Sequence, residues 1–264
     1  MDEIESQLAE TDPDRYVANF FAPASARPGL AALYAFDNEV ARIGLSVREP
    51  MVGHIRLAWW REQIAAIYAG EAVHAPVSKA LAAAVKRWQP PRLLFDSYVN
   101  ARACDLDEAP FADETAFETS ARQTAGSILL LALRVLGADH RAEAAVQHTA
   151  PAIAYRTALR EFQAARAVRR YRQPVAWLES AGLAVEDALA DDASPELGIV
   201  TAKARERIDR CLARTNGARF RLKAMPALAV ATLARIAFDP FQPVELTPWQ
   251  RASRLALANL MWRV

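Results

Sequence analysis

The sequence contains few cysteines and few glycines, two and nine respectively in 264 residues. Cys104 and Cys211 have neither the spacing of a metal site nor that of a disulfide framework, which indicates a reduced setting and a cytoplasmic protein. Ala and Leu are abundant where Gly is scarce, and this composition favours helix over strand. The first expectation is therefore an all-α protein without disulfide bonds.

Long apolar runs and an excess of charge are also missing. The nearest candidate for a membrane span, residues 128–136, is short and contains Arg134. The first ten residues, MDEIESQLAE, are acidic and polar, unlike a secretory signal or a transit peptide. Lys and Arg number 32 against 31 Asp and Glu, so bulk charge gives no indication of a nucleic-acid partner. The sequence predicts a protein that is soluble or peripheral to a membrane.

What the sequence does contain is a helical pattern. Hydrophobic residues make up 53% of the chain, enough for one sizeable core. Asp12 before Pro13 is expected to cap a helix, and Gly70 and Gly137 are expected to end two others. The longer expected helices span 29–47, 50–70, 77–88, 92–104, 115–136, 141–149, 150–174, 179–189, 198–216, 226–237 and 248–264. We therefore predict a polar lead at 1–11 and a single all-α domain at 12–264.

Residues 33–42, LYAFDNEVAR, contain two carboxylates, and one interpretation is that they bind Mg²⁺, an ion that prefers several oxygen ligands. Asp37 and Glu39 are two residues apart, so on a helix they point about 200° away from each other. They are therefore poorly placed to share a metal ion. The alternative is a surface charge pair in which Glu39 lies near Arg42.

Residues 150–174, APAIAYRTALREFQAARAVRRYRQP, combine helical spacing with six arginines and one carboxylate, Glu161. Arginines at this density can bind a diphosphate or a lipid phosphate without a metal ion. The same pattern is also typical of a solvated face with cations at a helix C-terminus. The sequence leaves both interpretations open.

These stretches resemble the squalene/phytoene synthase family. Residues 27–36, RPGLAALYAF, are similar to the lead-in of the family's first metal-binding helix, Tyr-Ala-Phe-Cys-Arg-x-x-Asp-Asp-x-x-Asp. Residues 150–174 resemble its second catalytic segment, Asn-x-x-Arg-Asp-x-x-Glu-Asp, which ends in Gly-Arg-x-Tyr-Leu-Pro. Residues matching a third family segment are Trp60, Arg61, Tyr68, Gly70 and His74. The resemblance implies an isoprenoid-synthase helical bundle around a central cavity.

The sequence departs from the family at the metal ligands. Ala41, Arg42, Leu45, Ala164 and Ala165 stand where the family has Asp or Glu. Ionising an allylic diphosphate relies on Mg²⁺ held between facing carboxylates, and Glu161 alone is a poor site for that ion. We therefore expect no bound metal and no cofactor.

The resemblance also assigns roles to individual residues. It places Tyr34, Phe36, Ala154 and Thr157 in the lining of the cavity. It assigns diphosphate or lipid-phosphate binding to Arg42, Arg160 and Arg170. If catalysis survives, the catalytic residues would be Asp37, Glu39 and Glu161, with Glu161 as the metal ligand.

Two functions follow from the resemblance. One branch of the family keeps the fold but lacks both aspartate-rich motifs, and it contains a mitochondrial complex I assembly factor. Similarity to that branch implies a non-catalytic scaffold that binds a respiratory-complex subunit or assembly protein at the inner membrane surface, with room for an isoprenoid or lipid ligand. The alternative is a Mg²⁺-dependent prenyltransferase that condenses two farnesyl or geranylgeranyl diphosphates.

The last expected helix bears on membrane association. Its apolar face is formed by Leu257, Leu260, Met261 and Val264. Such a helix either packs on the core or lies in a membrane interface. The sequence does not decide between the two.

Overall fold

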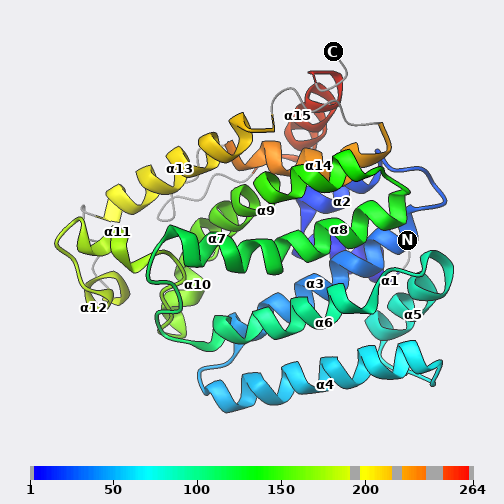
Figure 1. Cartoon of the computed structure of the whole chain (residues 1–264), viewed down its shortest axis with the longest axis horizontal. Coiled ribbons are helices and arrows are strands. Elements are labelled where there is room, and N and C mark those ends of the chain that lie inside the picture. Colours follow the sequence, from blue (N-terminus) through cyan, green and yellow to red (C-terminus); the bar gives the residue numbers. More distant parts are fainter. Residues whose placement is uncertain (1–2, 191–196, 216–221, 236–245, 262–264) are drawn as a thin grey trace.

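The structure is a computed structural model that describes residues 3–190, 197–215, 222–235 and 246–261. Within these ranges it contains α-helices and 3-10 helices and no strand, which confirms the all-α prediction (Figure 1). The α-helices are α1 (Glu3–Thr11), α2 (Pro13–Asn19), α3 (Arg27–Ser46), α4 (Pro50–Ala69), α5 (Pro76–Trp88), α6 (Arg92–Ala101), α7 (Glu114–Gln123), α8 (Ala125–Leu136), α9 (His140–Arg160), α10 (Phe162–Ala167), α11 (Val175–Glu179), α12 (Val185–Leu189), α13 (Leu197–Ala213), α14 (Met225–Leu228) and α15 (Pro248–Met261). The 3-10 helices are η1 (Arg102–Leu106), η2 (Leu222–Ala224) and η3 (Ala229–Arg235).

Helix α3 lies inside the bundle and contacts α1, α2, α4, α5 and α8. Its Phe36 ring packs against Trp60 of α4 and against Phe95 and Tyr98 of α6, with ring centroids 4.9, 5.5 and 5.3 Å away. Aromatic pairs at these separations add to the stabilisation that burial alone provides. Phe36 is therefore a core residue that joins three helices.

Helix α9 organises the other half of the core and contacts α7, α8, α13 and η3. Its Tyr155 ring stacks between Phe117 and Trp177, with centroids 4.4 and 5.4 Å away. This stack joins α9 to α7 and α11. The two aromatic groups thus fix α3 and α9, the helices that carry the residues of interest.

The three helix boundaries predicted from single residues are confirmed. The Asp12 carboxylate accepts a hydrogen bond from the Arg15 amide at 3.0 Å and caps α2. Gly70 and Gly137 follow α4 and α8 with φ of 75° and 62°, in the left-handed region that glycine adopts without strain.

Two expected helices are bent. Residues 115–136 form α7 and α8, which meet at Thr124, where the hydroxyl donates to the Ser120 carbonyl at 2.8 Å. A Thr hydroxyl that bonds back in this way competes with the backbone and bends a helix. The expected helix at 150–174 is interrupted at Glu161, which separates α9 from α10, and it ends at Ala167, so residues 168–174 are not helical. Helix α9 itself extends back to His140 through Pro151.

The expected polar lead is a helix. In α1, Ile4 and Leu8 are buried and the helix packs on α3. The Thr11 hydroxyl accepts a hydrogen bond from the Asn38 side-chain amide at 2.8 Å, which holds the end of α1 on α3. Two apolar residues four apart in an otherwise polar stretch are a weak signal, and the sequence analysis missed it.

The last helix packs on the core through Leu255 and Ala258, and Leu257 is exposed. The side chains of Leu260 and Met261, and all of Val264, lie outside the described residues. The predicted apolar face at Leu257, Leu260, Met261 and Val264 is thus described only at its first residue.

Gly44 lies where α3 approaches η1. A Cβ atom added to it would lie 2.9 Å from Asp105 Cβ and 3.0 Å from the Asp105 carbonyl oxygen. Gly44→Ala should therefore destabilise the protein by about 1–2 kcal/mol in urea unfolding, although Ala ordinarily favours a helix by up to ~1 kcal/mol. The control is Gly198→Ala, since that site in α13 has no atom within 4 Å of the added Cβ. A stabilising Gly44→Ala would contradict this packing.

Candidate functional site

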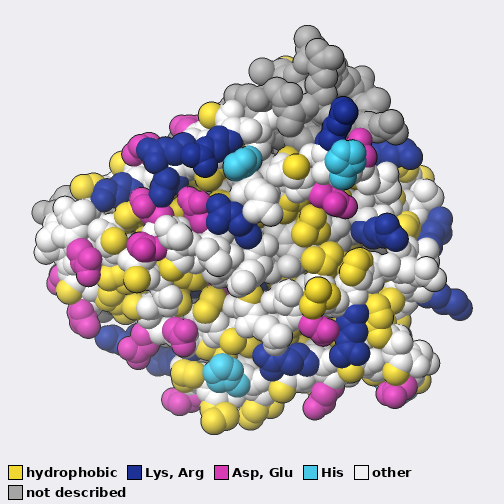
Figure 2. All heavy atoms as spheres, viewed as in Figure 1, with side chains coloured by type: hydrophobic (Ala, Val, Ile, Leu, Met, Phe, Trp, Pro, Cys, Tyr) yellow, Lys and Arg dark blue, Asp and Glu magenta, His cyan; other side chains and the backbone are white. Residues whose placement is uncertain are grey.

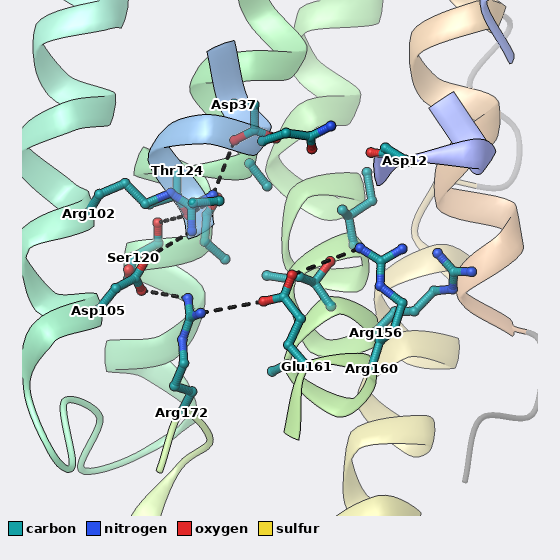
Figure 3. A pocket seen from close by; sticks show the side chains of 18 of the residues that line it. Asp12, Asp37, Arg102, Asp105, Ser120, Thr124, Arg156, Arg160, Glu161 and Arg172 are labelled. Carbon is teal, nitrogen blue, oxygen red and sulfur yellow. Dashed lines mark hydrogen bonds and ion pairs between the residues drawn. The ribbon is translucent and has the colours of Figure 1, made fainter. Parts of the chain in front are cut away.

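A cavity of about 90 Å³ lies between α2, α3, η1, α7 and α9 (Figure 3). Charged side chains line it in equal numbers of each sign. The carboxylates are Asp12, Asp14, Asp37, Asp105 and Glu161, and the guanidiniums are Arg15, Arg102, Arg156, Arg160 and Arg172. We call these ten residues the ion-pair network. The cavity is small beside the roughly 300–1,000 Å³ of an ordinary ligand pocket.

Asp37 of α3 is a buried carboxylate of this network, and it contacts residues of α6 and η1. Its carboxylate accepts hydrogen bonds from Arg15 and from the Tyr98 hydroxyl, and Arg102 Nη2 lies 3.2 Å away. Burial alone would raise the pKa of Asp37, but the Arg15 and Arg102 guanidiniums and the Tyr98 hydroxyl hold it below its ordinary value. Burial also raises the pKa of Tyr98 well above its ordinary value. Asp37 is therefore a charged and fully partnered carboxylate at neutral pH.

A chain of ion pairs crosses the cavity from η1 to α9. Asp105 accepts from Arg102 Nη1 at 3.0 Å and from Arg172 Nη2 at 2.6 Å. Arg172 Nη1 lies 3.4 Å from Glu161 Oε2, and Arg160 Nη2 lies 3.9 Å from Glu161 Oε1. Figure 3 shows this sequence of contacts, with Arg172 between the two carboxylates. These ion pairs link η1, Arg172 and the C-terminal end of α9 across the cavity.

Asp14 of α2 joins the cavity to the last helix. Its two carboxylate oxygens accept from Arg156 of α9 at 2.6 Å and from Arg251 of α15 at 2.7 Å. Burial opposes ionisation of Asp14, yet Arg156 and Arg251 hold its pKa below the ordinary value. Asp12 lies 3.5 Å from Arg15. Every carboxylate of the ion-pair network therefore contacts at least one arginine.

The structure brings together half of the residues that the sequence analysis selected. Those that line the cavity are Asp37, Ala154, Thr157, Arg160 and Glu161. Those that lie elsewhere are Tyr34, Phe36, Glu39, Arg42 and Arg170. Tyr34 supports the cavity from the core, since the Arg15 guanidinium lies 4.9 Å from its ring centroid.

Asp37 and Glu39 point to different sides of α3, as their spacing predicts. Glu39 and Arg42 line a separate cleft between α3 and α4, together with Trp59. The interpretation of a surface charge pair is wrong for Asp37, because that residue is buried. Sequence spacing fixed the angle between the two carboxylates but not which of them faces inward.

Arg170 is a buried residue outside the cavity. Its guanidinium donates to the carbonyls of Gly44 at 2.9 Å, Val47 at 2.5 Å, Arg48 at 3.1 Å and Leu106 at 3.1 Å. These bonds satisfy carbonyls at the C-terminal end of α3, where a positive charge is favourable. The expectation that Arg170 binds a phosphate is therefore wrong, because its guanidinium already donates to four backbone carbonyls.

Seven residues of the ion-pair network were not selected as site residues from the sequence. They are Asp12, Asp14, Arg15, Arg102, Asp105, Arg156 and Arg172. Arg102 and Asp105 are three apart, a spacing at which a charge pair can be expected. Asp12 and Arg15 have the same spacing, but several other pairs join residues that are far apart in the chain, for example Arg172 and Asp105, and no local pattern indicates those.

The residues that line the cavity do not fit Mg²⁺. That ion takes about six oxygen ligands in near-octahedral geometry, usually with one or two protein carboxylates. Here each cavity carboxylate already contacts an arginine, so a divalent cation would have to displace guanidinium groups. Across the described ranges, no group of three or more His, Cys, Asp or Glu residues is arranged to hold a metal ion. In the same ranges, no helix is long and apolar enough to cross a membrane.

Comparison with known proteins gives a family match over most of the chain. The sequence model described as Squalene/phytoene synthase matches residues 8–258. The crystal structure of squalene synthase HpnC from Alicyclobacillus acidocaldarius superposes with a TM-score of 0.67 at 20% identity, covering 98% of this chain and 93% of that one. This similarity supports the isoprenoid-synthase fold.

Two characterised relatives carry different names. NADH dehydrogenase (ubiquinone) complex I, assembly factor 6, from Homo sapiens is 32% identical over 154 residues, which are 58% of this chain and 46% of the human protein. Phytoene synthase from Rhodobacter capsulatus is 28% identical over 204 residues, which are 74% of this chain and 58% of that enzyme. The chain spans about half the length of the curated relatives it matches.

Proposed function

Since the chain belongs to the squalene/phytoene synthase family, we propose that it keeps the fold of these synthases without their catalysis. In this proposal it is a scaffold that assists the assembly of a respiratory complex. It has lost both metal-binding motifs of the family and needs no cofactor.

The ion-pair network is the observation that carries this proposal. Arginines neutralise Asp37, Asp105 and Glu161, so these carboxylates are not available to bind the metal ion that would hold a diphosphate. Ala41 of α3 lines the same cavity, where the family's first motif has a ligand carboxylate. A charge-neutral, internally bonded cavity stabilises the fold and offers little to the developing charge of a prenyl transfer reaction.

The relatives indicate what such a scaffold would do. Several proteins named as complex I assembly factor 6 match this chain at 30–32% identity over the same length. We infer that the partner is a respiratory-complex subunit or another assembly protein, met at the inner membrane surface. A small isoprenoid or lipid group is a further ligand under this proposal, and it would bind in the cavity between α3 and α9.

The alternative is an active prenyltransferase. The match to a phytoene synthase favours it, and so does the presence of Asp37 and Glu161 in the cavity. Under this alternative, Arg102 and Arg172 would have to release their carboxylates when Mg²⁺ and a diphosphate enter. Glu39 would contribute nothing to the same metal, because it lines a different cleft.

Glu161→Ala separates the two functions in the organism that carries the protein. Deleting the gene should remove most of the assembled complex I on a native gel, and the Glu161→Ala variant should restore it as well as wild type does. Glu161→Ala should lower the free energy of unfolding by less than about 1 kcal/mol, because Glu161 is partly exposed and Arg172 retains its ion pair with Asp105.

Lipid analysis of the same strains tests the alternative, an active prenyltransferase. Loss of a squalene- or phytoene-type product on deletion, restored by wild type but not by Glu161→Ala, would establish the enzyme instead. An unchanged level of complex I in the deletion strain would contradict the assembly role.

A further inference from the structure

Helix α4 is apolar on both of its sides. Its inner side packs on the bundle through Gly53, Leu57, Trp60, Ile64 and Ile67. On the opposite side, the exposed fractions are 69% for Met51, 41% for Val52 and 61% for Ile55, and Trp59, exposed to 40%, lies at the edge of this side, where it also lines the cleft to α3. A helix at the surface of a globular protein usually carries polar residues there. Exposed apolar side chains gathered in this way mark an interaction surface.

The position of α4 leaves this side open. Figure 1 shows α4 as the outermost helix along the lower edge of the molecule, and Figure 2 shows hydrophobic side chains along the same edge. Helix α4 contacts α3, α5, α6 and η1. At about 1.5 Å per residue its 20 residues span about 30 Å.

Side-chain size changes along the outer side of α4. We define the outer α4 face as Met51, Val52, Ile55, Ala58, Trp59, Glu62, Ala65, Ala66 and Ala69, which fall on one side at 100° per residue. Its N-terminal half carries the four large apolar residues. Its C-terminal half carries alanines and one charged residue, Glu62. Such a face is complementary to itself when it is turned end for end.

We propose that two copies of this chain form a dimer in which their α4 helices pack antiparallel across a two-fold axis near Ala58. In this arrangement Met51 and Val52 of one copy lie over Ala65 and Ala66 of the other, and Ile55 of each copy lies between Ala58 and Glu62 of the other. The small side chain at Ala58 lets the two helices approach closely where they cross. An isologous contact of this kind uses the same patch on both subunits.

The charges agree with the same register. Glu62 of one copy comes level with residues 54–56 of the other, where Arg56 flanks the outer α4 face. Arg56 lines the edge of the cleft to α3, where it donates to the Ser46 hydroxyl at 3.0 Å, and no ion pair with a described residue is found for it. Each Glu62 can therefore pair with Arg56 of the second copy, and the two-fold axis produces this pair twice.

The position of Glu62 argues against a lipid bilayer as the partner that covers the outer α4 face. It lies in the middle of the outer α4 face, so a bilayer that covered this face would take a carboxylate into an apolar medium at a substantial cost. A second copy offers it an arginine instead. The inference goes beyond the proposed function and holds whether or not the cavity is catalytic.

Sedimentation of the purified protein at micromolar concentrations tests the dimer. Wild type should sediment with twice the mass of one chain, and Ile55→Glu should raise the dimer dissociation constant by at least about 100-fold, since both copies lose the contact. The control is Leu257→Glu, an exposed leucine of α15 at the far end of the molecule, which should leave the dimer intact. Circular dichroism should be the same for all three proteins.

Charge reversal tests the register. Glu62→Arg and Arg56→Glu should each raise the dissociation constant about tenfold, and the double variant should return it to within about threefold of wild type. Three outcomes would overturn the proposal. They are a wild-type monomer at all concentrations, a dimer that Ile55→Glu leaves intact, and a monomer that binds phosphatidylcholine–phosphatidylglycerol vesicles through Ile55.

Discussion

Replacing Arg170 with alanine should lower the free energy of unfolding by about 3–5 kcal/mol. The Arg170 guanidinium is buried and donates to carbonyls from α3, from the residues after α3 and from η1. Without it, those carbonyls would be left without a donor, and each such group costs about 1–3 kcal/mol. Because α3 is followed by Val47 and Arg48 rather than a glycine cap, no local group takes over.

Thermal unfolding and urea titration both measure this loss. At this chain length the midpoint temperature should fall by roughly 10 °C. Arg170→Lys should recover little of the loss, because a single ammonium group cannot reach carbonyls on opposite sides as a planar guanidinium does. The matched control is Arg169→Ala, at the exposed residue immediately before Arg170, which should change stability by less than about 0.5 kcal/mol.

The result also separates two roles for Arg170. If it bound a phosphate group, its removal would affect ligand binding and leave the fold nearly unchanged. A loss of less than about 1 kcal/mol would therefore contradict the capping role described here.

Replacing Asp37 with alanine should cost a similar amount, about 3–5 kcal/mol at neutral pH. Arg15 and Arg102 would each lose one of two carboxylate partners in the protein interior, and they would keep only Asp12 and Asp105 respectively. The Tyr98 hydroxyl would also lose its carboxylate acceptor and keep only the backbone carbonyl of residue 37, at 3.2 Å. Asp37→Asn keeps the shape but removes the charge, and it should lose most of the same free energy.

The pH dependence of this loss has a definite sign. The pKa of Asp37 is below its ordinary value in the folded protein, so its ionisation stabilises the fold above the pKa of the unfolded chain. The difference between wild type and Asp37→Asn should be complete above about pH 5 and should shrink as the pH falls below about 4. Urea titrations across this range provide the measurement.

A surface pair provides the control for Asp37. Asp96 lies 3.1 Å from Arg92 on the exposed side of α6, and Asp96→Asn should cost less than about 1 kcal/mol at any pH. A deficit for Asp37→Asn that stays constant down to about pH 3 would show that its charge does not act through the two arginines.

Much of the fold was predictable from local patterns. Gly70, Gly137 and Asp12 end or begin helices because their backbone and side-chain preferences act within a few residues. The bends at Thr124 and Glu161 were not predicted, because the apolar spacing continues through both residues. Periodicity indicates which side of a helix is buried, and it does not indicate where that helix bends.

The site was less predictable than the fold. Several of its ion pairs join residues far apart in the chain, as Asp14 and Arg251 do, and partner choice at that distance depends on the assembled bundle. Family resemblance selected the right helices, since Asp37 and Glu161 both face the cavity. It misplaced Arg170, because the motif gives a residue type at a position and the structure decides which groups lie beside it.

Pyrophosphate release is the measurement that tests the central claim most directly. The purified protein would be incubated with farnesyl or geranylgeranyl diphosphate, in Mg²⁺ or in EDTA, beside an active synthase and a boiled sample. The ion-pair network predicts no release above the boiled sample in either condition, for wild type and for Glu161→Ala alike. Release that requires Mg²⁺ and disappears in Glu161→Ala would contradict the account and establish a working prenyltransferase.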